Sequence, residues 1–333
     1  MRISLKPQLN MLALVARIEP RPSEFASAEG HLATVRSRLL RSFDMANIVR
    51  IGSHARGTAV RSYSDLDVLA VLRRNEAKWG RRIVSSETLL SRVREDLKER
   101  FQSTHIRADQ QAAVVGFAQG RQSLDVVPAL WGRFSAKRPV YSIPDGYGGW
   151  LETSPEAHNR QFRIANLRSA RKLERLCRLM RWWKFSRAQP IPLQTFHTDI
   201  LFAVEDACVG AKPYTHCLYS AFRLLATRQC RALKDPVGIA GNIPAAKTDA
   251  QREVLMDAVE YALQQLDVEL TVKLNPNIHD REIRLDNGWV IKIGRGLDFY
   301  QKPASWFEVG AHDLNLRKCL ETKVDIFKAP GLR

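Results

Sequence analysis

The sequence predicts an α+β fold made of three consecutive regions. Residues 1–150 mix short β-prone runs with helical patterns, residues 151–265 follow a helical periodicity almost throughout, and residues 266–333 return to alternating apolar runs. A chain of 333 residues with 45% apolar content can form two or more domains. We therefore expect a mixed first domain, a helical second domain and a small β-rich C-terminal extension.

A Gly-Ser turn follows the first β-prone run. Residues 48–51 have strand-forming side chains, and Gly52 after them permits a tight turn. Residues 53–60 are expected to form a short helix or turn whose first backbone N–H groups are free. Free N–H groups at a helix start, together with the hydroxyl of Ser53, can bind phosphate groups. Gly52 and Ser53 are therefore candidates for holding a triphosphate.

Three carboxylates are the candidate catalytic and metal-binding residues. Asp65 and Asp67 open the apolar strand predicted over residues 66–72, and side chains two residues apart on a strand point to the same face. Asp125 lies in a second strand-like run, residues 123–129, and would complete the cluster from a neighbouring strand. Carboxylate oxygens suit Mg²⁺ (or Mn²⁺), which also keeps waters and substrate phosphates in its shell. Two such ions activate an attacking 3′-hydroxyl and stabilise leaving pyrophosphate.

The alternative interpretation is that these residues are surface acids at the starts of strands. An Asp-x-Asp pair or a Gly-Ser pair alone is common by chance in a chain of this length. The joint order is much rarer: a strand, a Gly-Ser turn, a short helix, an Asp pair opening an apolar strand and a lone Asp in another strand. The joint order favours the two-metal interpretation.

The elements after the first strands follow from periodicity and from Pro and Gly. Residues 88–101 predict an amphipathic helix behind the sheet, and residues 133–149, with their prolines and glycines, predict a connecting loop. Residues 155–187 predict one long helix, here called the spine helix. Its core-facing stripe consists of Phe162, Ala165, Ser169, Leu173, Leu176, Met180 and Trp183.

A second face of the spine helix carries Arg171, Arg175 and Arg178. This face is either a solvated basic surface or a groove for nucleic acid, although no aromatic residues interleave its arginines for base stacking. Residues 190–192 end the helix, since they contain two prolines. Thr195 is the expected N-cap of the next helix, and His197 is expected to be a packing residue rather than a catalytic base.

The tail predicts strands over residues 268–274, 281–285 and 289–293. Asn287 and Gly288 lie between the last two apolar runs, and an Asn-Gly pair in that position is a strong hairpin signal.

Composition and charge limit the partners and the compartment. The formal net charge of +17 and the pI near 10.0 indicate polyanionic partners: NTPs, and in addition nucleic acid or an acidic lipid surface. No apolar run reaches membrane-spanning length, and five cysteines without a C-x-x-C pair favour reduced thiols in the cytoplasm. A zinc cluster is disfavoured because no trusted zinc spacing is matched by Cys208, His216, Cys217 and Cys230.

Residues 1 to about 265 resemble the bacterial cGAS/DncV-like nucleotidyltransferases, relatives of oligoadenylate synthase. Besides the motifs above, the resemblance rests on residues 18–20 with the helix over 24–41, on residues 150–155 before the spine helix, and on residues 234–237 with Asn242. It implies a polymerase-β-like palm, a helical second domain, Mg²⁺ dependence and NTP substrates, ATP among them. It also implies a cyclic oligonucleotide product that signals in anti-phage defence.

The resemblance also assigns roles to individual residues. Gly52 and Ser53 would hold the triphosphate, and the three aspartates would bind the metals. Where the family often has a Lys followed two residues later by Trp, this chain has Arg181, and Lys184 is a candidate substitute for the phosphate-binding cation. A hydroxyl near the position of Thr195 often contacts the nucleotide base in relatives.

Residues 270–328 resemble the latter half of the C-terminal phospholipase-D-like domain of MIT-domain proteins. The likeness is carried by residues 278–283, 287–289, 293–298, 316–317 and 324–327, and by Asp313. It implies membrane or partner binding rather than lipid hydrolysis, because His279, Lys292 and Asp298 depart from the hydrolase spacing H-x-K-x₄-D. A structural β-extension is the alternative.

Three classes of function fit the sequence. The first is a synthase that joins NTPs into a cyclic or linear oligonucleotide. The second is a nucleotidyltransferase-like scaffold that senses nucleic acid or membrane, and the third is an enzyme that tails RNA or another acceptor. The three aspartates favour an enzyme over a scaffold, because a scaffold has no physical need for converging carboxylates.

Overall fold

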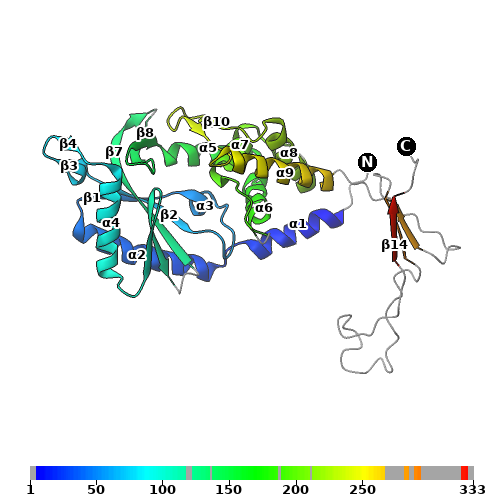
Figure 1. The fold of residues 1–333 in the computed structure, drawn as a ribbon, viewed down its shortest axis with the longest axis horizontal. Helices are drawn as coiled ribbons and strands as arrows, with labels where there is room; N and C mark the ends of the chain where they lie inside the picture. Colours follow the sequence, from blue (N-terminus) through cyan, green and yellow to red (C-terminus); the bar gives the residue numbers. More distant parts are fainter. Residues whose placement is uncertain are drawn as a thin grey trace, which may run out of the picture. The chain divides into compact units, whose positions relative to one another are not determined.

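The computed structural model describes residues 5–117, 122–135, 137–186, 189–210, 212–266, 281–284, 289–293 and 324–328. The chain divides into two compact units, residues 1–260 and residues 261–333. The first unit contains a mixed sheet with helices packed against it and a set of helices that follows in sequence (Figure 1). The expected combination of a mixed α+β region and a helical region is confirmed by these elements.

The palm is the part of the first unit built around the mixed sheet. Its strands pair in the order β1-β2-β7-β6-β5, with β8 added to β7 and β9 added to β8. The β2–β7 pair is parallel, and the other neighbours are antiparallel. Helix α1 (Leu5–Ile18) precedes the palm. The palm elements are α2 (Pro22–Ser42), β1 (Met45–Arg50), α3 (Gly52–Arg56), β2 (Leu66–Leu72), the 3₁₀ turn η1 (Arg74–Ala77), β3 (Lys78–Trp79), β4 (Arg82–Ile83), α4 (Ser86–Arg100), β5 (His105–Asp109), β6 (Ala112–Phe117), β7 (Gln122–Ser135), β8 (Arg138–Pro144) and β9 (Trp150–Thr153).

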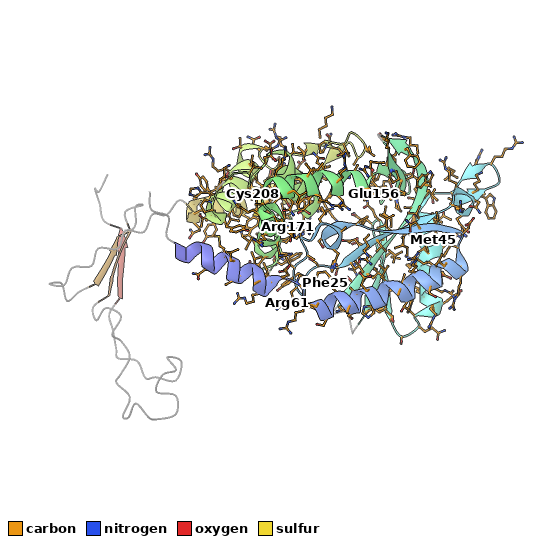
Figure 2. The ribbon with its side chains drawn as sticks, turned by 180° about the vertical axis from the view of Figure 1, so that it is seen from behind. Phe25, Met45, Arg61, Glu156, Arg171 and Cys208 are labelled. Atoms are coloured by element: carbon orange, nitrogen blue, oxygen red, sulfur yellow. The ribbon has the colours of Figure 1, made fainter. Side chains whose placement is uncertain are left out.

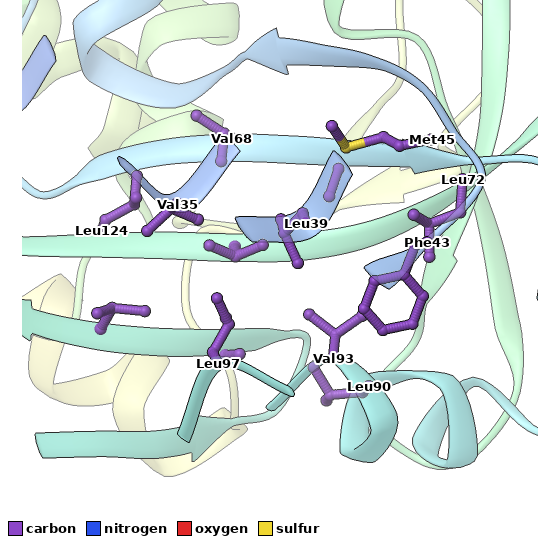
Figure 3. Packing of buried hydrophobic residues seen from close by; sticks show 14 of the residues in the cluster. Val35, Leu39, Phe43, Met45, Val68, Leu72, Leu90, Val93, Leu97 and Leu124 are labelled. Atoms are coloured by element: carbon purple, nitrogen blue, oxygen red, sulfur yellow. The ribbon is translucent and has the colours of Figure 1, made fainter. Parts of the chain in front are cut away.

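The palm core lies between one face of the sheet and helices α2 and α4 (Figure 3). Val68 and Leu72 of β2 point to this face, where they pack with Val35 and Leu39 of α2 and with side chains of α4. The intervening residues of β2 therefore point to the opposite face, because strand side chains alternate. This alternation places Asp67 on the face away from α2 and α4.

Residues 133–149 are not the connecting loop that their prolines and glycines predicted. Most of them continue β7 and form β8, which pair as an antiparallel ribbon. Gly132 lies at the register shift of this ribbon, where a Cβ atom would approach the carbonyl oxygen of Val140 to 2.8 Å. The glycine thus serves close backbone approach within a strand pair, which a composition argument cannot distinguish from a loop.

The spine helix is two helices rather than one. Helix α5 (Pro155–Arg168) and helix α6 (Lys172–Phe185) are separated by Ala170 and Arg171, which have φ angles of 52° and 62°. Asn166 stabilises the break, since its backbone oxygen accepts from the amide of Arg171 and its side-chain oxygen accepts from the amide of Glu174. Figure 2 shows Arg171 among the helices of this region. The predicted apolar stripe is nevertheless buried over Phe162, Ala165, Leu173, Leu176 and Met180.

The remaining helices follow α6 in sequence. They are α7 (Thr195–Val204), α8 (Tyr214–Thr227) and α9 (Asp249–Leu266), with the short strands β10 (Leu233–Lys234) and β11 (Asn242–Ile243) paired between α8 and α9. Gln194 is the N-cap of α7, so the expectation that Thr195 caps this helix was wrong by one residue. No helix in the described part of the chain is both long and apolar enough to cross a membrane.

The second unit contains a three-stranded antiparallel sheet. Strand β12 (Arg281–Arg284) pairs with β13 (Trp289–Ile293), and β13 pairs with β14 (Val324–Lys328). The predicted strand pair on either side of Asn287 and Gly288 is thereby confirmed. The strand predicted over residues 268–274 and the Asn-Gly turn itself lie outside the described residues.

Candidate active site

Asp67 and Asp125 lie side by side on neighbouring strands. Strands β2 and β7 run parallel, and Asp67 is the register partner of Asp125. Both side chains are half-buried on the sheet face opposite α2 and α4. Asp65 precedes β2 by one residue and is exposed. The two strands expected to bring these acids together are therefore neighbours.

The carboxylates affect each other's ionisation. Burial raises the pKa of Asp67 to about 7, and the charge of Asp65 adds to this shift. Burial likewise raises the pKa of Asp125 to about 7, with contributions from Asp67 and Asp65. The Oδ1 atom of Asp125 is buried without a hydrogen-bond partner among the described residues. Such a site disfavours negative charge unless a cation enters it.

The donor set fits a divalent cation with open coordination positions. Among the described residues, no three His, Cys, Asp or Glu side chains converge into a ready-made metal cage. Mg²⁺ does not require such a cage, because it binds through one or two carboxylates and takes its other ligands from water and substrate phosphates. The adjacent oxygens of Asp67 and Asp125, and the unpartnered Oδ1 atom of Asp125, meet that requirement.

The Gly-Ser turn begins directly beside Asp67. The amide of Ile51 donates a 2.9 Å hydrogen bond to the backbone oxygen of Asp67, which brings the start of α3 against β2. Gly52 has a φ of 66°, and a Cβ atom there would lie 1.9 Å from Oδ2 of Asp67. Only glycine fits at this position. Ser53 follows it in α3 and is buried.

Arg178 connects helix α6 to the loop after α3. Its guanidinium donates to the backbone oxygens of Ala59 at 3.1 Å and Gly57 at 2.6 Å. The side chain is buried and also contacts Glu19 at 3.1 Å. The expectation that Arg178 shares an open basic face with Arg171 was therefore wrong, because this arginine fixes the loop that follows the Gly-Ser turn.

Arg181, the expected phosphate-binding cation, is part of a buried cluster of charges. Its Nη2 atom donates to Oδ2 of Asp199 at 2.7 Å, and Nε of Arg56 donates to the same oxygen at 2.8 Å. Burial opposes ionisation of Asp199, but Arg181 and Arg56 outweigh it and hold its pKa below the ordinary value. Both arginines also favour the charged form of Asp67, so the cluster lies close enough to influence the carboxylates.

Arg56 and Asp199 were not among the site residues predicted from the sequence. Arg56 belongs to the motif that begins at Gly52, and Asp199 lies four residues after Thr195. The two residues are 143 positions apart, so their pairing could not be derived from local sequence. A signal was nevertheless present, because α7 is apolar along its length and a buried Asp in such a helix needs a cationic partner.

Lys184 and Thr195 are not part of the cluster formed by Arg56, Arg181 and Asp199. The Lys184 ammonium donates to the backbone oxygen of Leu193 at 2.8 Å, and burial together with Arg181 lowers its pKa. Thr195 is the first residue of α7 and is half-buried. His197 is buried, with Nδ1 at 2.9 Å from the backbone oxygen of Ile243, a position that suits the expected packing role.

Asp235, in the late Asp-Pro motif, organises a loop. It accepts hydrogen bonds from the backbone amides of Val237, Ile239 and Ala240. The Nε2 atom of His158 in α5 lies 2.8 Å from Oδ1 of Asp235, the oxygen that also accepts from Val237, and both side chains are buried. The motif therefore fixes the segment between β10 and β11 against α5.

A mixed sheet that carries aspartates on neighbouring strands, beside a Gly-Ser turn, defines a palm of the nucleotidyltransferase class. Residues 5–166 match the family described as the Second Messenger Oligonucleotide or Dinucleotide Synthetase domain. Residues 198–328 match the Phospholipase D-like domain at the C-terminus of MIT. Residues 5–166 thus form a domain homologous to the cGAS/DncV-like nucleotidyltransferases, and residues 198–328 are homologous to the MIT-associated domain.

Solved structures share the fold of the first unit. A structure of CdnC from Escherichia coli MS115-1 with ATP has a TM-score of 0.62 and 19% identity, covering 78% of this chain and 91% of that one. CdnG from Bradyrhizobium diazoefficiens in complex with GTP has a TM-score of 0.61 and 13% identity, covering 78% of this chain and 90% of that one. At these identities the similarity concerns the fold.

Two curated relatives match different parts of the chain. A cyclic AMP-AMP-AMP synthase of Escherichia coli (strain MS 115-1) is 24% identical over 209 residues, which cover 62% of this chain and 63% of the relative. MIT domain-containing protein 1 of Mus musculus is 40% identical over 116 residues, which cover 34% of this chain and 46% of the relative. The chain therefore spans about half to two thirds of the length of these relatives. The MIT-associated match begins at residue 198, well before the expected start near residue 270.

Proposed function

We propose that this protein is a metal-dependent nucleotidyltransferase that joins NTPs into a cyclic or linear oligonucleotide. The observation that carries the proposal is the pairing of Asp67 with Asp125 across β2 and β7, beside the turn at Gly52. In this proposal, hard oxygen ligands lie next to a backbone turn that would bind phosphate. An acidic cluster whose pKa values are raised by burial is costly to keep unless it binds cations.

Each candidate residue has a role in this proposal. Asp65, Asp67 and Asp125 would hold Mg²⁺ or Mn²⁺, which when bound would supply charge stabilisation at the phosphates and an activated hydroxyl. Gly52 and Ser53 would hold the triphosphate through backbone N–H groups and a hydroxyl. Arg181 would add a cationic phosphate contact, Lys184 would be the second candidate for it, and Thr195 would contact the base.

A pyrophosphate-release assay tests the metal site. We expect the protein to release pyrophosphate from a mixture of four NTPs only with Mg²⁺ or Mn²⁺, and Asp67→Asn to reduce the rate by at least about 100-fold. Asp257→Asn is a matched control, since Asp257 is exposed on α9 and makes no ion pair in the described residues. Undiminished release by Asp67→Asn would remove Asp67 from the site.

The proposed product is a second messenger, as the family description and the synthase relative suggest. We place its synthesis in the cytoplasm, where NTPs are available, and its use in anti-phage signalling. The scaffold and RNA-tailing alternatives share the fold. An enzyme that tails RNA needs an acceptor strand, so product formation from NTPs alone separates it from a cyclic oligonucleotide synthase.

We propose for the C-terminal region a docking role on an acidic membrane or partner. The support is the match of residues 198–328 to the MIT-associated domain, together with the predicted basic charge of the chain. Juxtaposed Lys and Arg side chains each contribute about 1 kcal/mol of attraction to an anionic lipid surface. This role is separate from nucleotidyl transfer.

A further inference from the structure

The arginines predicted on one face of the spine helix do not form an open basic surface. Of the three arginines expected on one open face, Arg178 is buried and bonded to backbone oxygens, and Arg175 donates to the hydroxyl of Tyr214 at 2.8 Å. Only Arg171 of the three is exposed. Most accessible cations of this chain, whose net charge is +17, therefore lie outside this face.

One such place is the β3–β4 hairpin, which is exposed along its whole length. Trp79 is 82% exposed, and its cross-strand partner is Arg82. Lys78 and Arg81 complete the set of cations, and none of the three cations makes an ion pair within the described residues. Ile83, the partner of Lys78, is also exposed. An indole between unpaired cations on a two-stranded hairpin has no packing role in this unit.

The β7–β8 ribbon adds a second set of aromatic and cationic side chains at the same end of the sheet. Leu72, the last residue of β2, is the register partner of Leu130, so β3–β4 and the ribbon both leave the sheet from this end. Trp131 and Phe134 are exposed on the ribbon, with their rings 5.2 Å apart in an edge-to-face contact. Lys137 and Arg138 lie beside them. Figure 1 shows β3, β4 and β7 at this end of the palm.

We name these residues the palm-end surface: Lys78, Trp79, Arg81, Arg82, Trp131, Phe134, Lys137 and Arg138. Three acids near this end of the sheet are paired with other arginines: Asp44 with Arg73, Glu76 with Arg92 and Glu152 with Arg133. The surface therefore keeps a net positive charge. Leu72 lies five positions after Asp67 along β2, which amounts to about 17 Å of strand, so the surface is distinct from the carboxylate site.

The hairpin is held in place by several contacts rather than projecting freely. The amide of Val84 donates to the backbone oxygen of Ala77 at 2.8 Å and closes the hairpin. The indole nitrogen of Trp150 donates to the backbone oxygen of Val84 at 3.2 Å, and the amide of Asp44 donates to Glu76 at 2.8 Å. Figure 2 labels Met45, the residue after Asp44, which marks this end of the palm.

We propose that the palm-end surface binds single-stranded nucleic acid. Exposed aromatic rings provide faces on which bases stack, and the unpaired cations contact the phosphates between them. A duplex would use the cations and leave the rings without bases to stack on. An anionic membrane would also attract the cations, but the apolar residues here are separated by charges and do not form a continuous face. This proposal does not depend on the enzyme activity.

Fluorescence anisotropy of a labelled 20-nucleotide oligo(U) strand tests the proposal with the full chain. Trp79→Ala is expected to weaken binding by about 5- to 150-fold, the range for loss of one stacked base. A combined reversal of Lys78, Arg81 and Arg82 to Glu is expected to weaken it further and to flatten its salt dependence. The matched control reverses Arg36, Arg163 and Arg231, three exposed arginines elsewhere, and should change affinity much less.

The outcomes separate the possible partners. Tighter binding of the single strand than of a duplex of the same length, lost in Trp79→Ala, supports the proposal. Equal loss in the palm-end and control variants would mean that binding follows net charge, and would overturn it. Binding to phosphatidylserine vesicles that depends on Trp79, without binding to the strand, would assign the surface to a membrane instead. Circular dichroism of each variant confirms that the comparison concerns folded protein.

Discussion

Arg56 and Asp199 form a buried ion pair that joins helix α3 of the palm to helix α7. The Arg56 Nε atom lies 2.8 Å from Oδ2 of Asp199, and the side chains are 4% and 0% exposed. Arg181 of α6 shares the same oxygen at 2.7 Å. The pair therefore couples the Gly-Ser turn, the cation expected to bind phosphate and the helical region through one carboxylate.

Removing the charge of Asp199 should destabilise the fold. Asp199→Asn leaves two buried guanidinium groups without a counter-charge, and we expect the free energy of unfolding to fall by about 3–5 kcal/mol. Asp206→Asn breaks the exposed pair with Arg168 and should cost less than about 1 kcal/mol. Urea unfolding followed by circular dichroism measures both. An equal effect of the two substitutions would mean that the buried pair adds nothing beyond a surface contact.

Relieving the repulsion at Asp67 should stabilise the metal-free protein at alkaline pH. The pKa of Asp67 is raised to about 7 in the folded chain, so the folded state binds more protons than the unfolded state between about pH 4 and 7. Stability therefore falls as the pH rises through this window. We expect Asp67→Asn to raise the Tm at pH 8 by about 2–4 °C, which corresponds to about 1 kcal/mol, and to have little effect at pH 4.

Bound Mg²⁺ should reverse this pH dependence of stability. Carboxylate ligands must be deprotonated to bind a cation, so Mg²⁺ binding should release protons below pH 7 and its apparent affinity should fall with decreasing pH. Calorimetry in two buffers with different ionisation enthalpies measures the released protons. A Tm of Asp67→Asn at or below that of the wild type at pH 8 would contradict the raised pKa, as would Mg²⁺ binding without proton release at pH 6.5.

Arg181 and Lys184 should differ in their effect on the KM for NTP. A charge-assisted contact to phosphate contributes about 1.5–3 kcal/mol, so Arg181→Ala should raise KM by about 10- to 100-fold. Lys184→Ala should have a smaller effect, because its ammonium bonds the Leu193 backbone oxygen. Steady-state kinetics with ATP measures both, and Arg181→Lys keeps the charge as the control. The reverse ranking would assign the phosphate contact to Lys184.

Truncation after Gln265 should separate synthesis from docking. Residues 1–260 form a compact unit, so the shortened chain should keep its nucleotide product. It should no longer sediment with anionic liposomes at low salt, whereas the full chain should do so and should be released by salt. Loss of synthesis in a folded truncated chain would place the tail in the catalytic body. Failure of the full chain to bind liposomes would contradict the membrane interpretation.

The strands of the palm, the neighbouring positions of Asp67 and Asp125, and the strand pair of the tail were predictable because each follows from a local signal. Alternation fixes the common face of Asp65 and Asp67, and the Asn-Gly pair predicts the hairpin between β12 and β13. The break between α5 and α6 was not predictable, because the apolar stripe continues through it while Asn166 caps the gap by side-chain bonds. Likewise, strand β8 contains Pro139 and Pro144, which composition assigned to a loop.

The candidate site was predictable only in part, for the same physical reason. Position 52 requires glycine because Asp67 occupies the space that a Cβ atom would take, and the sequence analysis predicted only a tight turn there. The Arg56–Asp199 pair depends on contacts across 143 residues, and only the fold brings them together. Arg178 looked like a solvated cation because helical periodicity cannot distinguish an outward face from one covered by another domain.

Mass spectrometry of a phosphatase-treated reaction tests the central claim most directly. The full chain is incubated with all four NTPs and Mg²⁺ or Mn²⁺, and phosphatase then removes every terminal phosphate. We predict a phosphatase-resistant cyclic oligonucleotide whose mass is a sum of nucleoside monophosphates less one water for each linkage, and which is absent from the Asp67→Asn and Asp125→Asn reactions. Recovery of nucleosides alone from the wild-type reaction, under conditions where the protein is folded and NTPs are bound, would contradict the proposed synthase.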